Sequence, residues 1–256
     1  MIYYFSATGN GKRVAEIIAD ITNDKVMSIT DVLAANCMRQ DLLTEKQVGI
    51  ISPTYAWGLP SIVNEFLENI QLKLNEDTYM FFVATYGTTP GTTGHLANKI
   101  LRQKNNRSFN AFYSVKMPDT WTPVFDLSDQ DVVNRKNEAA EKEMKEVAKR
   151  ILSKETPRRM KLAMPVAAVP IYKIYYNQMR KTKNFHVDDS CIGCTLCEKK
   201  CPVKAIEMKD SKPVWVKEKC TMCLGCLHRC PKFAIQYGKG GATKRHGQYK
   251  NPYTKI

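Results

Sequence analysis

The sequence predicts an α/β protein, a doubly wound sheet of five parallel strands, followed by a small α+β domain rich in cysteine. Short apolar stretches alternate with amphipathic helical patterns over residues 1–153, as in a parallel sheet covered by helices on both faces. Eight of the nine cysteines fall between residues 191 and 230. Charge is divided too: residues 1–110 hold ten basic and ten acidic side chains, so residues 111–256 carry the whole net charge of +14.

Five apolar segments are expected to form the strands: 1–5, 24–29, 48–51, 79–85 and 111–115. The first is followed by apolar residues at helical spacing, from Val14 to Ile21. Similar patterns follow the third and fourth strands, and a long helix is expected over about 128–153. Strand and helix therefore alternate along the whole first part of the chain.

We expect four parts along the chain: the sheet domain at 1–153, a basic connector at 154–186, the cysteine-rich domain at 187–237 and a tail at 238–256. The connector holds eight basic residues and three prolines, and it is expected to run along the first domain with a short helix near 171–180. The tail is rich in Gly, Lys and Tyr and is expected to be loosely ordered.

No signal-peptide core or membrane span is visible in the sequence. We therefore expect a cytoplasmic protein, in which dense cysteines bind metal or act in redox chemistry rather than form disulfides. Cys37 stands apart from the others and is expected to be a buried small hydrophobe.

The cysteine-rich segment is an internal repeat with a period of 29 residues. Each copy reads C-x2-C-x2-C-x3-C-P, which is the cysteine run of bacterial iron–sulfur proteins. Three closely spaced thiolates wrap one face of a cubane cluster, and the fourth must arrive from elsewhere. Zinc is the alternative, because sulfur ligands alone do not separate the two metals, although zinc sites favour C-x2-C pairs separated by a longer loop.

Both copies of the repeat are complete, and the segment resembles the dicluster ferredoxins of bacteria along its whole length. In that family the fourth ligand of each cluster comes from the other half. The resemblance implies two 4Fe-4S clusters, and His228, between two of their ligands, is expected to face solvent or to shield its cluster. One cluster would be held by Cys191, Cys194, Cys197 and Cys230, and the other by Cys220, Cys223, Cys226 and Cys201.

A loop rich in hydroxyls and glycine follows the first expected strand, at a place where helix N-terminal amides bind phosphate. A Walker loop does not fit, because Ser6 and Arg13 stand where it needs Gly and a hydroxyl residue. A Rossmann fingerprint does not fit either, because Val14 stands where it needs Gly or Ala. The residues of the loop are Ser6, Ala7, Thr8, Gly9, Asn10 and Gly11.

Two further loops with glycine and aromatic residues follow the third and fourth strands. Because the carboxyl ends of parallel strands meet at one edge of a sheet, all three loops are expected to lie together. These two loops contribute Pro53, Thr54, Tyr55, Ala56, Trp57 and Gly58, and Thr85, Tyr86, Gly87 and Gly91.

Together the three loops resemble the FMN-binding loops of flavodoxins, over about 150 residues. The resemblance implies that the loop at 6–11 holds the FMN phosphate, that Tyr55 or Trp57 stacks on the isoalloxazine and that Tyr86 covers its edge. It also implies the strand order of that family. Gly11 departs from the family, which usually has Thr or Ser there. The alternative is that these aromatic side chains only pack under their loops.

The whole chain thus resembles a flavodoxin–ferredoxin fusion. A flavin holds one or two electrons and each cluster passes one, so FMN and two clusters can exchange an electron pair one electron at a time. We expect an electron-transfer protein that passes electrons between these cofactors and onward to a redox partner. Two alternatives stay open: a flavin-dependent oxidoreductase that reduces a small substrate at FMN with electrons from the clusters, and a redox-sensing or cluster-carrying protein.

The uneven charge predicts the kind of partner. A redox protein with an acidic docking surface is favoured, because opposite surface fields raise encounter rates. Contact with an anionic membrane surface is the alternative, since basic and aromatic residues mix near 172–183. Nucleic acid is not expected, because no reading helix or RNA-binding signature accompanies the basic residues.

Overall fold

Five parallel strands form the central sheet, in the order β2-β1-β4-β6-β7. The computed structural model describes all 256 residues of the chain. The order confirms the doubly wound sheet, with its switch point between the adjacent strands β1 and β4. The strands are β1 (Ile2–Tyr4), β2 (Val26–Ser28), β4 (Gln47–Pro53), β6 (Tyr79–Tyr86) and β7 (Ala111–Lys116).

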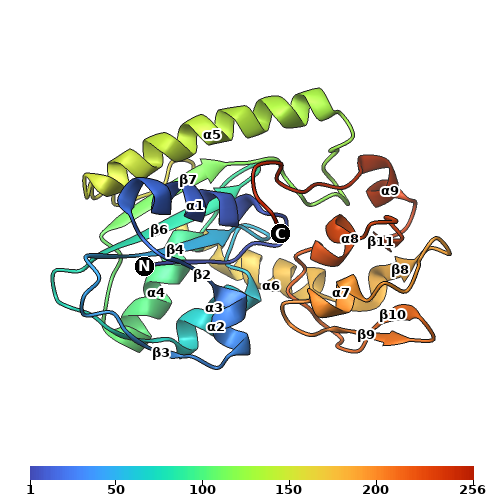
Figure 1. Cartoon of the computed structure of the whole chain (residues 1–256), viewed down its shortest axis with the longest axis horizontal. Helices are drawn as coiled ribbons and strands as arrows, with labels where there is room; N and C mark the ends of the chain where they lie inside the picture. The colour runs from blue at the N-terminus through green and yellow to red at the C-terminus, as the bar shows by residue number, and fades with distance from the viewer.

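Helices cover both faces of this sheet (Figure 1). On one face α1 (Asn10–Thr22) packs beside α5 (Gln130–Leu152), and on the other α3 (Ser61–Asn69) packs beside α4 (Thr93–Asn105) and α2 (Ile29–Ala34). The central strands β4 and β6 are therefore buried on both sides, which explains their continuous apolar sequences. Two strands that the sequence patterns did not predict, β3 (Arg39–Asp41) and β5 (Gln71–Lys73), pair outside the main sheet.

The connector folds along the first domain and contains the expected helix, α6 (Val169–Met179), after a short 3-10 turn, η1 (Val166–Ala168). Two buried tyrosines of α6 form hydrogen bonds with neighbouring parts of the chain. Tyr172 donates a hydrogen bond to the carbonyl of Leu59. Tyr176 donates to the carbonyl of Thr221 at 2.8 Å and accepts from the N–H of Ser61 at 3.0 Å. Helix α6 therefore ties the sheet domain to the cysteine-rich domain.

The cysteine-rich half contains two small antiparallel strand pairs and two short helices (Figure 1). β8 (Phe185–Val187), after the 3-10 turn η2 (Thr182–Asn184), pairs with β11 (Ile235–Tyr237), and β9 (Ile206–Lys209) pairs with β10 (Lys212–Trp215). The helices α7 (Leu196–Lys199) and α8 (Gly225–Arg229) pack together, one from each copy of the repeat. This half is the small α+β domain that the sequence predicted.

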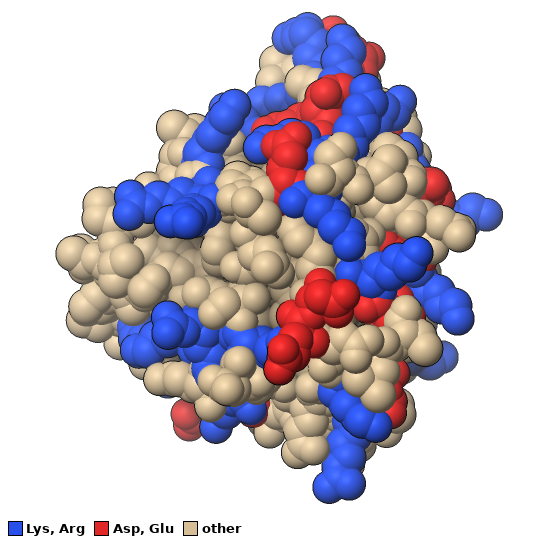
Figure 2. All heavy atoms as spheres, turned by 90° about the vertical axis from the view of Figure 1, so that its left-hand side faces the viewer, with Lys and Arg blue, Asp and Glu red and all other residues tan.

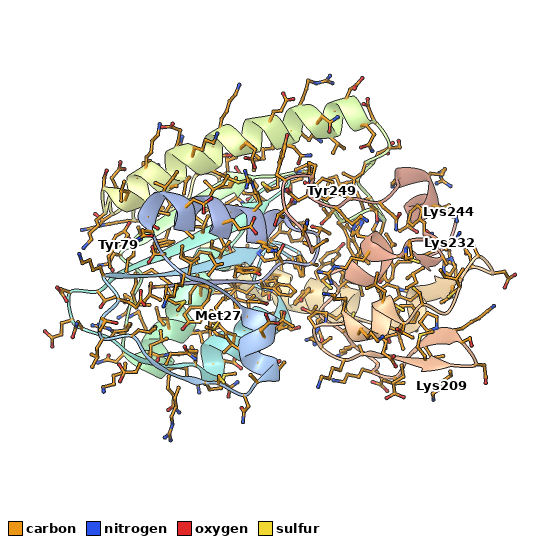
Figure 3. The ribbon with its side chains drawn as sticks, in the orientation of Figure 1. Met27, Tyr79, Lys209, Lys232, Lys244 and Tyr249 are labelled. Atoms are coloured by element: carbon orange, nitrogen blue, oxygen red, sulfur yellow. The ribbon has the colours of Figure 1, made fainter.

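The tail is ordered, so the expectation of a loose tail is wrong. After α9 (Ala242–His246) the chain returns to the sheet domain, where Tyr249 lies at the junction with α1 and α5 (Figures 1 and 3). Tyr249 is only 4% exposed, and its hydroxyl lies 2.8 Å from the side-chain oxygen of Asn10 and 2.7 Å from that of Asn137. The N–H of Asn251 donates to the carbonyl of Thr8 at 2.8 Å.

Two other expectations about single residues need correction, and for His228 only the first of its two alternatives, exposure to solvent, is contradicted. His228 does not face solvent: it is fully buried, and Nε2 lies 2.9 Å from the carbonyl of Thr120, while Nδ1 accepts from the N–H of Tyr249 at 3.1 Å. Burial lowers the pKa of His228 to about 4, which keeps the ring neutral and able to both donate and accept. Cys37, expected to be buried, is exposed, because no other segment covers the turn after α2.

Positively charged side chains are present at both ends of the molecule. Figure 2 views the end of the molecule opposite the cysteine-rich half, where Lys and Arg cover more of the surface than Asp and Glu, which gather near the middle and top of the view. At the other end, Lys209, Lys232 and Lys244 project from the outer surface of the cysteine-rich half (Figure 3).

The buried hydroxyl of Tyr249 is expected to contribute to stability, because its removal leaves Asn137 and Asn10 short of a hydrogen-bond partner. We expect Tyr249→Phe to lower the free energy of unfolding by about 1–3 kcal/mol. Urea unfolding followed by tryptophan fluorescence measures this. The control is Tyr253→Phe, since that tyrosine is exposed; an equal effect of both changes would contradict the role given to the Tyr249 hydroxyl.

Candidate functional site

A cavity of about 310 Å³ lies between the two halves, at the edge of the sheet where the strands end. The loops after β4 and β6 form one side of it, and α6 and the second cysteine run form the other. The segment that follows β7 closes one end. Of the residues that the sequence predicted, Thr54, Tyr55, Ala56, Trp57 and Gly87 line this cavity.

The loop after β4 is a tight turn that presents two aromatic rings. Tyr55 and Gly58 exchange backbone hydrogen bonds of 2.9 and 3.0 Å, and Ala56 and Trp57 between them both have positive φ angles, of 48° and 70°. Non-glycine residues in this conformation are strained, and such strain clusters at ligand sites. The ring of Trp57 stacks on Tyr175 of α6 with centroids 5.4 Å apart, so the two rings together form part of the wall.

Several predicted residues support the cavity rather than line it. Gly91 lies under the turn, where a Cβ would come within 2.1 Å of the carbonyl oxygen of Trp57, and Gly58 lies against the ring of Tyr172. Thr85 is buried at the end of β6, next to Pro53 in the strand register.

The interpretation of Tyr86 as a cover for the flavin edge needs correction. Tyr86 is the last residue of β6, and its ring is buried outside the cavity, where burial raises the pKa of the phenol and a hydrogen bond with Ser114 of β7 opposes that rise. Gly87 and Thr88, which follow β6 in the loop, line the cavity instead.

The segment after β7 contributes residues that the sequence reasoning missed. Asp119, Trp121 and Phe125 line the cavity, and so does Tyr175 of α6. Burial raises the pKa of Asp119 above its usual range, although the N–H of Trp121 donates to this carboxyl at 3.0 Å and favours its charged form. The edge rule that located the other loops applies equally to the loop after the fifth strand and could have found Asp119.

The hydroxyl-rich loop borders a second cavity, of about 360 Å³. Ser6 and Ala7 line it, and the Ser6 hydroxyl accepts the N–H of Gly9 at 3.1 Å. A Cβ on Gly11 would come within 2.5 Å of the Phe5 carbonyl, which explains why the usual hydroxyl residue is absent there. Five cationic side chains complete the wall: Lys12, Lys199, Lys200, Arg229 and Lys255.

Thr8, Gly9 and Asn10 of the same loop meet the tail. The side-chain oxygen of Asn10 accepts a hydrogen bond from the amide of Asn251 at 3.1 Å, and a Cβ on Gly9 would come within 2.8 Å of the Asn251 side chain. Gly9 has a φ of +100°, so this loop also needs glycine for its backbone conformation.

Cys223 borders both cavities. The two cavities therefore meet the second cysteine run at the same residue, and a ligand with a flat ring at one end and a phosphate at the other would have to pass Cys223 to occupy both. The aromatic walls suit an isoalloxazine, and the hydroxyls, loop amides and cations suit its phosphate. The residues present fit FMN.

Four cysteines meet at a third, small cavity of about 20 Å³: Cys191, Cys194 and Cys197 from the first run, and Cys230 from the second. Apolar side chains, among them Leu196 and Ile235, surround them. The structure therefore brings together the four thiols of one crossed set.

The other crossed set is also brought together, since the charge of Cys201 reaches Cys220, Cys223 and Cys226 and raises the pKa of each. Burial is the larger cause, and it raises the pKa of Cys220 to about 12 and that of Cys223 to about 11. Thiols of this kind ionise when a metal binds them.

Backbone N–H groups point at the sulfurs in both sets, from Ala205 to Cys201 at 3.2 Å and from Ala234 to Cys230 at 3.3 Å. Such hydrogen bonds tune iron–sulfur clusters. The donor sets fit 4Fe-4S clusters.

Comparisons with known proteins agree with this geometry. Residues 1–164 match the family model of a flavodoxin domain, and residues 190–235 match that of a 4Fe-4S dicluster domain. No curated protein matches the chain.

Among solved structures, the chain is similar to a Fusobacterium nucleatum flavodoxin bound to flavin mononucleotide, with 12% identity and a TM-score of 0.31. That match covers 41% of this chain and 64% of the other. A two-electron reduced Megasphaera elsdenii flavodoxin gives 14% identity and a TM-score of 0.35, covering 60% and 99% of the two chains. A flavodoxin from the domain Archaea gives 18% identity and a TM-score of 0.33. That match covers 58% of this chain and 97% of the other.

The crossed ligand sets lead to a prediction about pairs of substitutions. Cys194→Ser with Cys230→Ser is expected to remove the iron of one cluster only, because both residues border the same cavity. Cys223→Ser with Cys230→Ser is expected to remove both clusters. Iron and sulfide content and the electron resonance spectrum of the reduced protein distinguish the two results. If the first pair loses twice the iron of the second, the ligands are not crossed.

Proposed function

Because this chain belongs to the flavodoxin family and also carries a 4Fe-4S dicluster domain, we propose that it transfers electrons between FMN and two 4Fe-4S clusters and onward to a redox partner protein. The cofactors supply the redox chemistry, in which FMN takes one or two electrons and each cluster takes one. The protein sets their order, their surroundings and the access of partners.

The observation that carries this proposal is the position of Cys223, which is shared by the aromatic and the basic cavity. The cluster assigned to Cys220, Cys223, Cys226 and Cys201 would lie beside the flavin. This is the inner position, since Cys220 is buried and α6 and the sheet domain pack around it.

The other cluster would take the outer position. Cys194, one of its four ligands, is exposed, and the cavity of this ligand set opens beside Lys232. We propose that partner proteins exchange electrons at this outer cluster and that the inner cluster connects it to the flavin. The inner cluster would lie between the flavin and the outer cluster whichever way the electrons flow.

The partner is proposed to dock through an acidic surface. Lys232 and Lys209 are exposed near the outer end of the cysteine-rich half, and neither takes part in an ion pair of the chain (Figure 3). Opposite charges would orient a short-lived complex at this end. Contact with an anionic membrane surface is a second possibility for the exposed apolar residues of α6, Ile171 and Ile174, which lie close to Lys173 in the sequence.

Asp119 favours a second candidate function, that of a flavin-dependent oxidoreductase acting on a small substrate. It is a half-buried carboxyl with a raised pKa on the wall of the aromatic cavity, so it could hold a proton for a substrate reduced there. Asp119→Asn would then abolish reduction of small acceptors by the reduced protein. If the protein is an electron carrier without a substrate, Asp119→Asn would leave the rate of electron transfer to its partner unchanged.

We propose the cytoplasm as the location, because reduced thiols are needed for cluster assembly and none of the nine cysteines is paired in a disulfide. None of the helices combines the length and the apolar character needed to cross a bilayer.

The cofactor content is tested by anaerobic purification, with flavin, iron and sulfide measured on the same sample. The proposal expects FMN and the iron and sulfide of two 4Fe-4S clusters in each chain. Protein that binds zinc in place of iron, or that binds clusters and no flavin when FMN is supplied, would overturn it.

The proposed docking mode predicts a steep dependence on salt. Between 0.01 M and 0.15 M ionic strength the screening length falls from about 30 Å to about 8 Å. The rate of electron transfer to an acidic partner is expected to fall about tenfold over this range. Stopped-flow mixing measures it, and Lys232→Gln should reduce the low-salt rate. A rate of electron transfer that does not change with ionic strength would contradict electrostatic docking.

A further inference from the structure

Arg229 reaches from the cysteine-rich half to the phosphate loop of the sheet domain. It ends helix α8, and its Nη2 lies 3.5 Å from the Ser6 carbonyl, while its Nη1 lies 3.3 Å from the Lys200 carbonyl. Its Nε is buried and has no hydrogen-bond partner. No carboxylate forms an ion pair with Arg229 in this chain.

A partly buried guanidinium with an unused donor is costly unless an anion completes it. The basic cavity into which Arg229 faces is lined by four lysines, by one acidic side chain, that of Asp31, and by the terminal residue Ile256. Lys12 is already engaged, since it lies 3.5 Å from Glu16 and donates to the Lys255 carbonyl. The excess of cations over carboxylates calls for a ligand with more than one negative charge.

A phosphate monoester has that charge near neutral pH, and the planar fork of arginine matches its oxygens. The other side of the loop is covered by the tail, through Asn251 and Thr254 against Gly9. The side that remains open is the one where Ser6, Ala7 and Arg229 line the cavity.

We propose that Arg229 binds the phosphate of FMN, so that the flavin site of the sheet domain is completed by the cysteine-rich half. This inference rests on the proposed binding of FMN. It makes the flavin a ligand of both halves: its ring contacts the loops of the sheet domain, and its phosphate lies between the hydroxyl-rich loop and a guanidinium from α8. Flavin affinity therefore depends on the packing of α8 against residues 6–7.

The test compares FMN with riboflavin, which has the same ring and side chain without the phosphate. Flavin is removed from the cluster-loaded protein, and each ligand is titrated anaerobically by fluorescence quenching. Arg229→Gln is expected to weaken FMN binding at least tenfold and to change riboflavin binding by less than twofold. Iron and sulfide content, measured on the same samples, should equal that of the unaltered protein.

Lys204→Gln is the matched control, because it removes one positive charge from the same half at an exposed position with no other proposed role. It should leave both affinities unchanged. If Arg229→Gln does not retain its clusters, Arg229→Lys takes its place. It keeps the charge and loses the fork, and a lower FMN-to-riboflavin preference is again expected.

The outcomes separate the inference from the function on which it rests. Equal loss of FMN and riboflavin binding would mean that Arg229 only holds the two halves together, and unchanged FMN binding would mean that the phosphate lies elsewhere. Either result overturns the inference and leaves an FMN protein. If the unaltered protein binds neither ligand, the proposed function itself fails.

Discussion

Parallel strands place all their carboxyl ends at one edge of a sheet, and this constraint organises the whole molecule. The loops after β1, β4, β6 and β7 meet at that edge, and three later parts of the chain pack against it: α6, the second cysteine run and the tail. Covering the edge buries loop backbone that would otherwise face water, and it brings the cysteine runs beside the flavin loops. The ligand cavities lie within this interface.

Hydrogen bonds between distant segments fix the packing of the two halves. Tyr176 joins α3 to the second cysteine run through Ser61 and Thr221. His228 joins that run to the segment after β7 and to the tail, and it can do so only as a neutral ring. A buried polar group without its partner is expensive, so each of these bonds strongly favours this one arrangement of the halves. An electron-transfer protein needs such rigidity, because the rate depends on fixed separations between cofactors.

The arrangement also links the two kinds of cofactor. Cys223 is a thiol of the inner ligand set and part of the wall of the flavin cavity, and Arg229 lies in the same cysteine run as Cys226 and Cys230. The inner ligand set and the walls of the two cavities thus share one short segment of the chain. The outer ligand set, around Cys194, is instead exposed to solvent and to partners. The cysteine-rich half thus has one ligand set that borders the sheet domain and one that faces solvent.

The sequence by itself determined the five strands and the cysteine runs, because both signals are local. A strand buried on both faces must be apolar throughout, and the first three ligands of a cluster must be close in sequence. Only the tertiary structure decided which distant segments of the chain lie next to each other. The order of the tail, the burial of His228, the direction of Tyr86 and the approach of Arg229 to Ser6 all depend on contacts across the fold. Tyr249 and Asn10, for example, are separated by 239 residues. Periodicity shows that a face is covered, but it does not identify the distant segment that covers it, because that choice depends on the packing of the whole chain.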